Sequence, residues 1–313
     1  MKPYILVVGS SNTDMVVKTD RLPGPGETVL GGTFLMAAGG KGANQAVAAA
    51  RLGADVVFVA KVGKDVFGRQ AVELFEREGI DTSCMVRDAV DPSGVALITV
   101  DARGENCIVV ASGANANLVR GDLVAAEEKI RKAALVLVQL EIPLATVEYV
   151  AGLAAMHGIP VILNPAPACA LPDELFRGLF ALTPNQKEAE MLSGVAIVDR
   201  TSAERAALAL AGKGVGTVII TLGAEGALVL DGGEFQWVPA PVVTAVDTTA
   251  AGDVFCGALA VGLSEKWSMK DAVEFACAAA ALSVTKMGAQ TSAPFRGEVD
   301  GFRDGVNKVR DRL

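Results

Sequence analysis

Short runs of β-branched and apolar residues alternate along the chain with longer alanine-rich segments. The short runs have the length and composition of buried strands, and the longer segments have the apolar spacing of helices. Strands are expected at residues 4–8, 56–62, 135–140, 161–164 and 218–222, and helices at residues 43–52, 68–78, 121–133, 146–156, 186–192, 202–213, 254–263 and 270–285. This alternation predicts an α/β fold, with a mostly parallel central sheet flanked by helices.

Two stretches depart from this alternation and predict antiparallel hairpins. In the first, residues 15–20 and 27–30 flank a turn rich in proline and glycine. In the second, residues 94–100 and 106–110 flank the turn at residues 101–105. Together the two hairpins are expected to form a small antiparallel β-lid.

The lid is expected to take up residues of about 12–33 and 94–111, inserted in a single α/β domain that spans residues 1–313. A small isolated sheet leaves an apolar face uncovered. The lid is therefore expected both to cover a ligand site and to pair with a second copy of the chain.

Composition and charge limit the classes of partner. Of the 313 residues 51% are hydrophobic, as in folded globular proteins, and the net charge of −8 disfavours binding to nucleic acid or an anionic membrane. The five cysteines form no C-x-x-C pair, and the single histidine, His157, is expected in an exposed loop, which disfavours zinc sites, disulfide frameworks and serine–histidine–aspartate hydrolases. No export signal or membrane-spanning run is recognisable, so a cytoplasmic protein is expected.

A loop of small residues carries the clearest chemical signal. Asp247 and Asp253 flank Ala250, Ala251 and Gly252, directly before an apolar helical segment. A helix N-terminus with uncrowded N–H groups is an anion site. A carboxylate at such a place is unusual unless it takes a proton from a neighbouring hydroxyl. The loop therefore indicates phosphoryl transfer to an alcohol.

A second glycine-rich loop, at residues 39–44, also leads into a helix. Lys41 and Asn44 supply donors for sugar hydroxyls or a phosphate, and Gly40 lets a ligand approach the backbone closely. A plain strand-to-helix turn is the alternative. No Gly-Lys pair is followed by Ser or Thr and no G-x-G-x-x-G occurs, so the chain lacks both the Walker A loop and the dinucleotide fingerprint.

Polar residues follow several of the expected strands. Asn12 and Asp14 come just after the first strand, Glu141 follows the third, and Asn164 ends the fourth. In α/β sheets ligands bind at the carboxyl ends of strands, which makes these residues candidates for substrate contacts. An Asx turn, a solvated carboxylate and, for Asn164, a fixed turn before Pro165 are the alternatives.

Asn185 and Glu188 allow two interpretations. Their spacing is that of a capping box at the start of a helix. They could instead organise a hydrated Mg²⁺ near phosphates, because this ion keeps several waters and takes few protein ligands. Thr221, Gly223 and Gly226 likewise form either a bare turn after a strand or a loop that faces a triphosphate.

Residues 39–63 and 247–259 resemble the two signature regions of the phosphofructokinase-B-type (ribokinase-like) sugar kinases. The signatures stand in the expected order and separation, and the resemblance extends over residues 4–302. The matching positions are Gly39 to Asn44, Ala46, Gly53 and Gly63 in the first region, and Asp247, Thr248, Ala250 to Asp253, Gly257 and Ala258 in the second. The resemblance implies a ribokinase-like fold, ATP as phosphate donor and a small sugar as acceptor.

The same resemblance implies a role for each candidate position. Asp253 is implied as general base beside an anion hole made by the N–H groups of Ala250, Ala251 and Gly252. Sugar hydroxyls are implied to contact Asn12, Asp14, Gly40, Lys41, Asn44, Glu141 and Asp253, and ATP to contact Asn185, Thr221, Gly223, Gly226 and Gly252, with Mg²⁺ held through water near Glu188. K⁺ or a similar activating cation is implied at the Asp247 side chain, the carbonyls of Thr249, Ser283, Lys286 and Gly288, and the Ser292 hydroxyl. Cys277 stands where a polar contact to adenine is expected.

These inferences combine into one mechanistic hypothesis. Asp253 accepts the proton of the terminal (5-) hydroxyl of D-ribose as that oxygen attacks the γ-phosphate of ATP, giving D-ribose 5-phosphate and ADP, while the lid excludes water. The alternatives are the same reaction on deoxyribose, fructose or a nucleoside such as adenosine, and a non-catalytic sugar or nucleotide sensor. The resemblance also implies a homodimer that forms through the β-lid.

Overall fold

The computed structural model describes residues 3–310, and an eight-stranded sheet forms its centre. Most neighbouring strands are parallel, and only the β12–β13–β14 edge is antiparallel. In spatial order the strands are β14 (Glu234–Val238), β13 (Ala227–Asp231), β12 (Thr217–Thr221), β11 (Ala181–Leu182), β10 (Val161–Leu163), β9 (Leu135–Val138), β1 (Tyr4–Val8) and β4 (Asp55–Val59). The predicted α/β fold class is confirmed.

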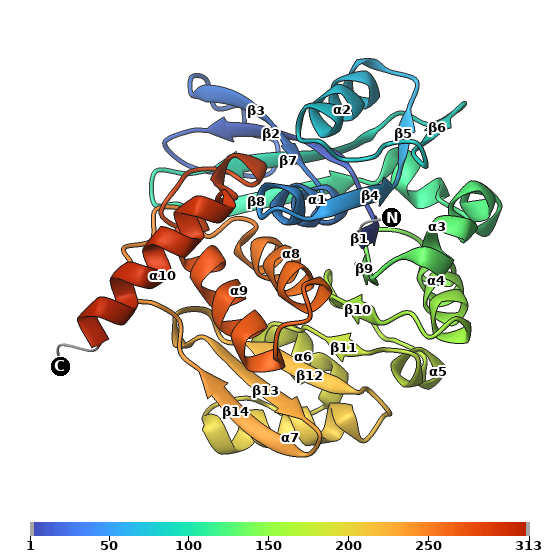
Figure 1. Cartoon of the computed structure of the whole chain (residues 1–313). Coiled ribbons are helices and arrows are strands. Elements are labelled where there is room, and N and C mark those ends of the chain that lie inside the picture. Colours follow the sequence, from blue (N-terminus) through green and yellow to red (C-terminus); the bar gives the residue numbers. More distant parts are fainter. Residues whose placement is uncertain (1–2, 311–313) are drawn as a thin grey trace.

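Helices cover both faces of this sheet (Figure 1). Successive strand residues point to opposite faces, so Ile5 and Val7 belong to one hydrophobic core while Leu6 and Val8 belong to the other. The first core is closed by α1 (Lys41–Arg51), α2 (Val66–Arg77), α8 (Ala251–Ser264), α9 (Met269–Ser283) and α10 (Arg296–Arg310). The second core is closed by α3 (Glu127–Lys132), α4 (Leu144–Met156), α5 (Asp173–Arg177), α6 (Gln186–Ser193) and α7 (Arg200–Ala211).

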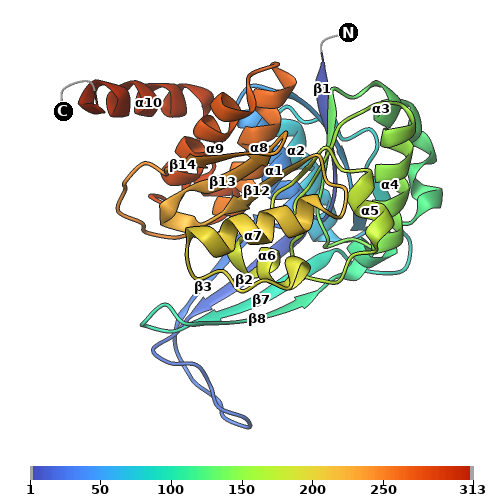
Figure 2. The ribbon, with the colours of Figure 1, turned by 90° about the horizontal axis from the view of Figure 1, so that it is seen from below.

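A separate four-stranded sheet, called the lid from here on, projects from the body (Figure 2). The lid was predicted to be antiparallel, but it is a mixed sheet: β2 pairs with β7 in parallel, and only its outer strands β3 and β8 run antiparallel to these. In spatial order its strands are β3 (Thr33–Gly39), β2 (Asn12–Lys18), β7 (Gly94–Val100) and β8 (Asn106–Ala111). The predicted hairpin of β7 and β8 is confirmed.

The first predicted hairpin is wrong in its returning strand. Residues 27–30 lie outside any strand, and the partner of β2 is β3. The seven residues of β2 pair one to one with the seven of β3, a match that the short segment beside the proline-rich turn does not offer. Asn12 and Asp14 consequently lie in an extended lid strand, so the Asx-turn alternative is wrong for both.

Two other predicted elements are divided in the structure. The run at residues 56–62 becomes β4 and β5 (Lys61–Gly63), because the chain leaves the central sheet and β5 pairs with β6 (Val86–Asp88). The helix expected at residues 121–133 begins as a 3-10 helix, η2 (Arg120–Ala126), before α3. Strands β6, β11, β13 and β14 and helices α5 and α10 were not predicted, and β11 is too short to give a pattern. The remaining 3-10 helices are η1 (Gly113–Asn117), η3 (Gly223–Glu225) and η4 (Gln290–Ser292).

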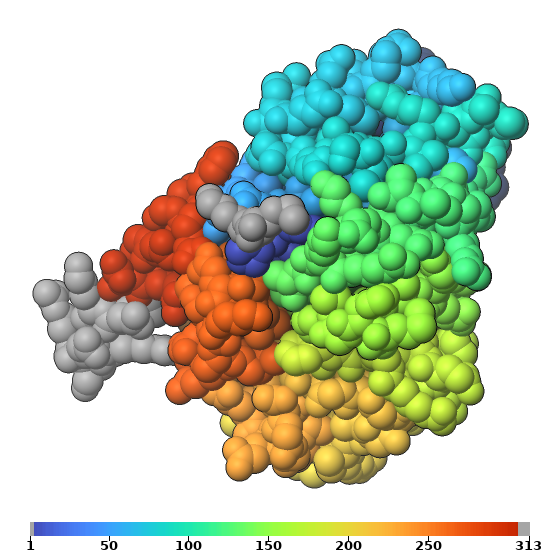
Figure 3. All heavy atoms as spheres, turned by 45° about the vertical axis from the view of Figure 1, so that its right-hand side comes forward, coloured from blue at the N-terminus to red at the C-terminus, as the bar shows by residue number. Residues whose placement is uncertain are grey.

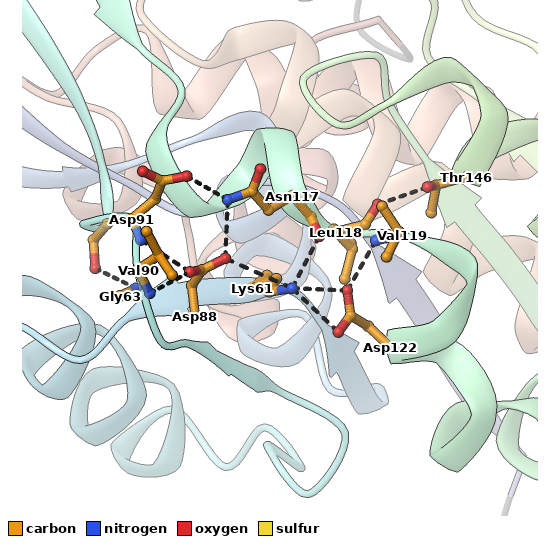
Figure 4. A network of polar contacts seen from close by, with 11 residues as sticks. Lys61, Gly63, Asp88, Val90, Asp91, Asn117, Leu118, Val119, Asp122 and Thr146 are labelled. Carbon is orange, nitrogen blue, oxygen red and sulfur yellow. Dashed lines mark hydrogen bonds and ion pairs between the residues drawn. The ribbon is translucent and has the colours of Figure 1, made fainter.

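A mostly buried cluster of charges connects the second lid hairpin to the body (Figure 4). Lys61 donates to the carbonyl oxygen of Asn117 (3.0 Å) and to Asp122 (3.0 and 3.2 Å). Asn117 in turn donates to Asp88 (3.0 Å) and to Asp91 (2.5 Å). Asp88 and Asp91 precede β7 while Asn117 follows β8, so the cluster fixes both points at which this hairpin leaves the body.

One face of the molecular surface shows how several elements are stacked. In Figure 3 the cyan segment with α2 lies above the green α3 and α4, and the yellow and orange elements lie below them. Over residues 3–310, no helix combines the length and the apolar composition needed to cross a membrane. All five cysteines are free thiols and His157 is exposed, as expected from the sequence.

Candidate active site

Polar side chains gather at the carboxyl ends of β1, β9, β10, β11 and β12, beneath the lid. A cavity of about 400 Å³ is lined by residues that include Asn12, Asn115 and Glu141. A neighbouring cavity of about 330 Å³ is lined by residues that include Lys41, Asn185, Glu188 and Asp253. The strand ends therefore bring most of the predicted sugar-binding and nucleotide-binding residues to one region.

The loop before α8 presents backbone N–H groups to this region. Ala250 is the N-cap of α8 and has a left-handed backbone with φ 59°, one of two such non-glycine residues in the described part of the chain. Among the described residues, the N–H groups of Ala250, Gly252 and Asp253 find no backbone acceptor, and that of Ala251 has only a 3.3 Å bond to Thr248. These free donors at the positive end of a helix are suited to an anion.

Asp253 lies in the first turn of α8 and is only 5% exposed. Its Oδ2 accepts a hydrogen bond from Asn44 (2.9 Å) and its Oδ1 accepts one from Gln45 (3.0 Å). Burial raises the pKa of Asp253 and outweighs the opposing effects of Lys41 and of the two amide donors. The carboxylate is thus held in place and made more basic, while each oxygen keeps a free lone pair.

Gln45 belongs to a chain of buried amides that the sequence reasoning missed. It accepts from Gln139 (2.5 Å) and donates to Asn164 (3.2 Å) as well as to Asp253. Asn164 donates to the carbonyl oxygen of Thr183 (3.0 Å) and so connects β10 to β11. A glutamine among the alanines of a buried helix face was the available signal, because such a group needs partners.

Lys41 begins α1 directly after Gly40, whose φ of 89° is accessible to glycine at little cost. Its backbone N–H donates to Glu141 (3.0 Å), which also accepts from Ser10 (2.6 Å). Burial by itself lowers the pKa of the Lys41 ammonium, but attraction by Asp253, Glu141 and Glu188 outweighs burial and the net pKa is raised. Lys41 therefore stays charged beside the cavity.

Asp14 lies on β2, and its carboxylate interacts electrostatically with those of Glu141 and Asp253. Burial, together with repulsion from Glu141 and Asp253, raises its pKa to about 6. A Cβ on Gly39, in the paired strand β3, would overlap the Asp14 carboxylate. Asn12 lies two residues earlier on the same face of β2 and is 7% exposed.

The capping-box interpretation of Asn185 and Glu188 is confirmed. The Asn185 side chain accepts from the N–H of Glu188 (2.9 Å), and Glu188 Oε2 accepts from the N–H of Asn185 (2.9 Å). Burial raises the pKa of Glu188 against the opposing effects of Asn185 and Lys41. The second carboxylate oxygen of Glu188 makes no hydrogen bond to any described residue, so the cap does not use the whole side chain.

An apolar cavity of about 310 Å³ adjoins the loop before α8 on the β12 side. It is lined by Thr221, Gly223 and Gly226 on one side and by Cys277 on α9 on another. Burial raises the pKa of the Cys277 thiol to about 12, so this residue offers an uncharged, weakly polar surface. The cavity is suited to a flat apolar group that continues from an anion at the helix N-terminus.

Asp247 joins the loop to the segment that follows α9. Its Oδ1 accepts from the N–H and hydroxyl of Thr249 (2.9 and 2.6 Å), and its Oδ2 accepts from the N–H of Gly288 (2.8 Å). Burial raises the pKa of Asp247, but these hydrogen bonds outweigh burial and the net pKa is lowered. The backbone N–H of Asp247 donates to the carbonyl oxygen of Val284 (3.1 Å), the residue that follows Ser283.

The other predicted cation ligands have partners of their own. Ser283 Oγ donates to Ala280 (2.8 Å), and its carbonyl oxygen accepts from the N–H of Lys286 (3.0 Å). The hydroxyl of Ser292 donates to Ala289 (2.8 Å) and is fully buried. Hydrogen bonds thus bring Asp247, Thr249 and Gly288 together, whereas none of those described connects Lys286 or Ser292 to Asp247.

Comparison with known proteins identifies the class to which this site belongs. The model of the pfkB family carbohydrate kinases matches residues 2–296. A ribokinase of Haemophilus influenzae is 45% identical over 302 residues, which cover 96% of this chain and 99% of that protein. A deoxyribokinase of Salmonella typhimurium is 38% identical and covers 93% of this chain and 95% of its own length.

Comparison with solved structures gives the same class of protein. The structure of Arabidopsis thaliana ribokinase complexed with ribose and ATP matches with a TM-score of 0.90 at 34% identity, over 96% of this chain and 99% of that one. The chain belongs to the pfkB family of carbohydrate kinases. It is a sugar kinase that uses ATP, and several ribokinases are among its relatives at 39–45% identity over nearly their full length.

Proposed function

We propose that the protein phosphorylates the 5-hydroxyl of D-ribose, giving D-ribose 5-phosphate and ADP. The observation that carries the proposal is the buried Asp253 carboxylate beside the free N–H groups of α8, near a cavity lined by the polar side chains of Asn12 and Glu141. The similarity to ribokinases supports ribose as the acceptor. A deoxyribokinase of comparable identity makes 2-deoxyribose the rival acceptor.

In this proposal Asp253 takes the proton of the attacking hydroxyl. Its raised pKa makes it a stronger base than an ordinary aspartate, and the amides of Asn44 and Gln45 orient it. The N–H groups of Ala250, Ala251 and Gly252 stabilise the negative charge that develops on the transferred group. Asn12, Asp14, Lys41, Asn44 and Glu141, with the backbone of Gly40, hold the other sugar hydroxyls, and the lid excludes water.

The nucleotide is proposed to bind across the two cavities on the β12 side. Asn185, Thr221, Gly223 and Gly226 would contact ATP, whose base would enter the apolar cavity beside Cys277. The unbonded oxygen of Glu188 fits a Mg²⁺ held through water, since this ion prefers oxygen ligands. Mg²⁺ supplies charge neutralisation on the phosphates when it is bound.

A monovalent cation such as K⁺ is proposed beside the anion hole. An ionised Asp247 and the carbonyl oxygens of Thr249, Ser283, Lys286 and Gly288 offer hard oxygen ligands, as does the Ser292 hydroxyl. A cation there would stabilise the loop that carries Ala250. Oδ1 of Asp247 already accepts two hydrogen bonds from Thr249, but Oδ2 accepts only one, from Gly288, and retains a lone pair for a cation, so the donor set fits.

We also propose that two chains dimerise through the lid. On the lid face that points away from Asp14, the strand register places Phe34, Met36, Leu97 and Val109 side by side, and these are 50–62% exposed. An apolar patch on this scale usually marks an interaction surface. The nature of the partner, a second copy, rests on the family resemblance.

The proposed reaction is tested by an assay of ADP release over a panel of pentoses, fructose and nucleosides, with and without K⁺. D-ribose should give the highest kcat/KM, and K⁺ should raise the rate. Asp253→Asn should lower kcat by about 10²- to 10⁴-fold with little change in sugar affinity. The exposed Asp304→Asn, on α10, is the matched control and should leave kcat unchanged.

Each part of the proposal can fail separately in this assay. A higher kcat/KM for 2-deoxyribose would replace the acceptor and keep the reaction. Near-normal turnover by Asp253→Asn would contradict the role of Asp253 as base. Absence of turnover with any sugar would favour the sensor alternative.

A further inference from the structure

Asn115 makes three hydrogen bonds at the base of the lid and is only 1% exposed. Its Oδ1 accepts from the backbone N–H of Ser11 (2.9 Å), and its Nδ2 donates to the backbone carbonyl of Ser11 (3.1 Å). The same Nδ2 donates its second hydrogen to Oδ1 of Asn12 (2.8 Å). The amide thereby joins η1, after the second lid hairpin, to the start of β2.

These contacts determine which way both amides point. A backbone N–H can only donate and a backbone carbonyl can only accept, so the pair of bonds to Ser11 fixes the orientation of the Asn115 amide. Its remaining hydrogen then requires an acceptor, and this fixes Oδ1 of Asn12 toward Asn115. Among the described residues, no backbone atom makes a hydrogen bond to the Asn12 side chain, so Asn115 alone orients it there.

The Asn12 amide nitrogen is consequently left for a ligand. No described residue accepts a hydrogen bond from Asn12 Nδ2, and Asn12 lines the cavity of about 400 Å³ together with Glu141 and Asn115. Asp14 lies on the same face of β2, two residues along. A sugar hydroxyl can therefore accept from Asn12 while it donates to Asp14.

The arrangement also depends on Gly94, which begins β7 opposite Asn12. A Cβ at this position would overlap both Oδ1 of Asn12 and Nδ2 of Asn115. The two amides are thus packed closely against the bare backbone of Gly94, while the hydrogen bonds to Ser11 determine their orientation. Segments from both lid hairpins meet at this one contact.

We propose that Asn115 is a positioning residue that holds Asn12 as a hydrogen-bond donor to the sugar. The proposal rests on the proposed sugar-binding role of Asn12. In this role Asn115 acts only through Asn12 and contacts neither the nucleotide nor the reacting oxygen. The preference for a hydroxyl oxygen beside Asn12 Nδ2 would then depend on Asn115, which is not among the sugar-binding residues predicted from the sequence.

The test is a double-mutant cycle on sugar binding. Asn115→Asp keeps the size of the side chain and the bond from the Ser11 N–H, but it cannot donate to Asn12. We expect a rise of about tenfold or more in the sugar KM, with the ATP KM unchanged and kcat much less affected. In an Asn12→Ala background, Asn115→Asp should change the sugar KM less than twofold.

A second variant tests the donor role without altering Asn115. In Asn12→Asp the carboxylate still accepts from Asn115, but it has no hydrogen to offer the sugar, so the KM should rise as much as in Asn12→Ala. The matched control is Asn117→Asp, also in η1. Wild-type Asn117 donates to Asp88 and Asp91 (Figure 4), so the variant should have a lower Tm but an unchanged sugar KM.

The outcomes separate this inference from the proposed reaction. A wild-type protein that turns over no sugar contradicts the proposed function. A functional wild type in which Asn115→Asp and Asn12→Ala raise KM multiplicatively overturns the positioning role, as does normal sugar affinity in Asn12→Asp.

Discussion

At the scale of single residues, the site concentrates carboxylates around one ammonium group. Asp14, Asp253 and Glu188 all have raised pKa values, and burial is the main cause for each. Lys41 is the cation that offsets them. The same burial that costs stability gives the site its basicity, because charged groups lose water on folding.

Asp14 should give sugar binding a dependence on pH. Its pKa of about 6 means that it is ionised above that pH and protonated below it, where the neutral acid is a much weaker acceptor for a sugar hydroxyl. The sugar kcat/KM should therefore fall about tenfold per pH unit as the pH is lowered below 6. Asp14→Asn should have a low kcat/KM at every pH and lack the part of this fall that Asp14 causes, which a profile from pH 5 to 8 would reveal.

The same variant should affect stability in the opposite direction. Because the folded pKa of Asp14 lies above its ordinary value, the folded chain binds this proton more tightly, and the resulting stability is lost as the pH rises through 6. Asp14→Asn should thus raise Tm at pH 8, and the gain should shrink as the pH falls from about 6 towards the ordinary value of 3.8, below which it should be absent. If the fall of kcat/KM below pH 6 is unchanged in Asp14→Asn, another carboxylate causes that fall, and Asp253 is the first candidate.

At the scale of elements, the pairing of β2 with β3 determines how Asp14 is presented. The strands pair in full register from Asn12 opposite Gly39 to Lys18 opposite Thr33. Gly39 ends β3 directly before Gly40, the N-cap of α1, so β3 continues into α1 without an intervening loop. The lid and the N-terminus of α1 are therefore coupled through two consecutive residues.

Gly39→Ala should weaken sugar binding while the nucleotide site stays intact. The added methyl would overlap the Asp14 carboxylate, and the displacement should cost about 1–3 kcal/mol, or roughly 5- to 150-fold in the sugar KM. Initial-rate kinetics with varied ribose and varied ATP would measure both constants. Gly121→Ala, where no atom lies within 4 Å of the added Cβ, is the control. Equal changes in both KM values would point to general loss of structure.

The sequence was sufficient for features set by local pattern. The buried strands and α8 followed from apolar runs. The strand-end rule selected Asn12 and Glu141, and the loop of small residues at a helix N-terminus selected Asp253, before any contact was known. It was insufficient for β3, since its partner choice depends on matching β2 over seven residues. Gln45 and Asn115 were not predicted because their importance lies in which polar groups they orient, a property of contacts 94 or more residues apart along the chain.

At the scale of the whole molecule, the lid is the least covered part of the fold. Its outer face is apolar, whereas most of the apolar residues of the body lie in two closed cores. Sedimentation at micromolar concentration should show a dimer, and Val109→Glu should give a monomer because a buried, unpaired carboxylate is strongly unfavourable. Val198→Glu, at an isolated exposed position before α7, should remain dimeric.

The neighbouring residue distinguishes the two lid faces. Ile108 precedes Val109 on β8 and points to the opposite face, the one shared with Asp14. A dimer that survives Val109→Glu and dissociates in Ile108→Glu would move the interface to that face. A monomeric wild type would contradict dimerisation through the lid altogether.

The excess of carboxylates over ammonium groups around Asp253 determines which cellular anions can bind at this site. A cleft with this charge balance does not accumulate inorganic phosphate, citrate or other abundant anions by simple attraction. An anion that binds must instead match the array of neutral N–H donors at the start of α8, group by group. Discrimination then comes from shape, and common metabolites that carry the right charge but the wrong outline are poor competitors for the place of ATP.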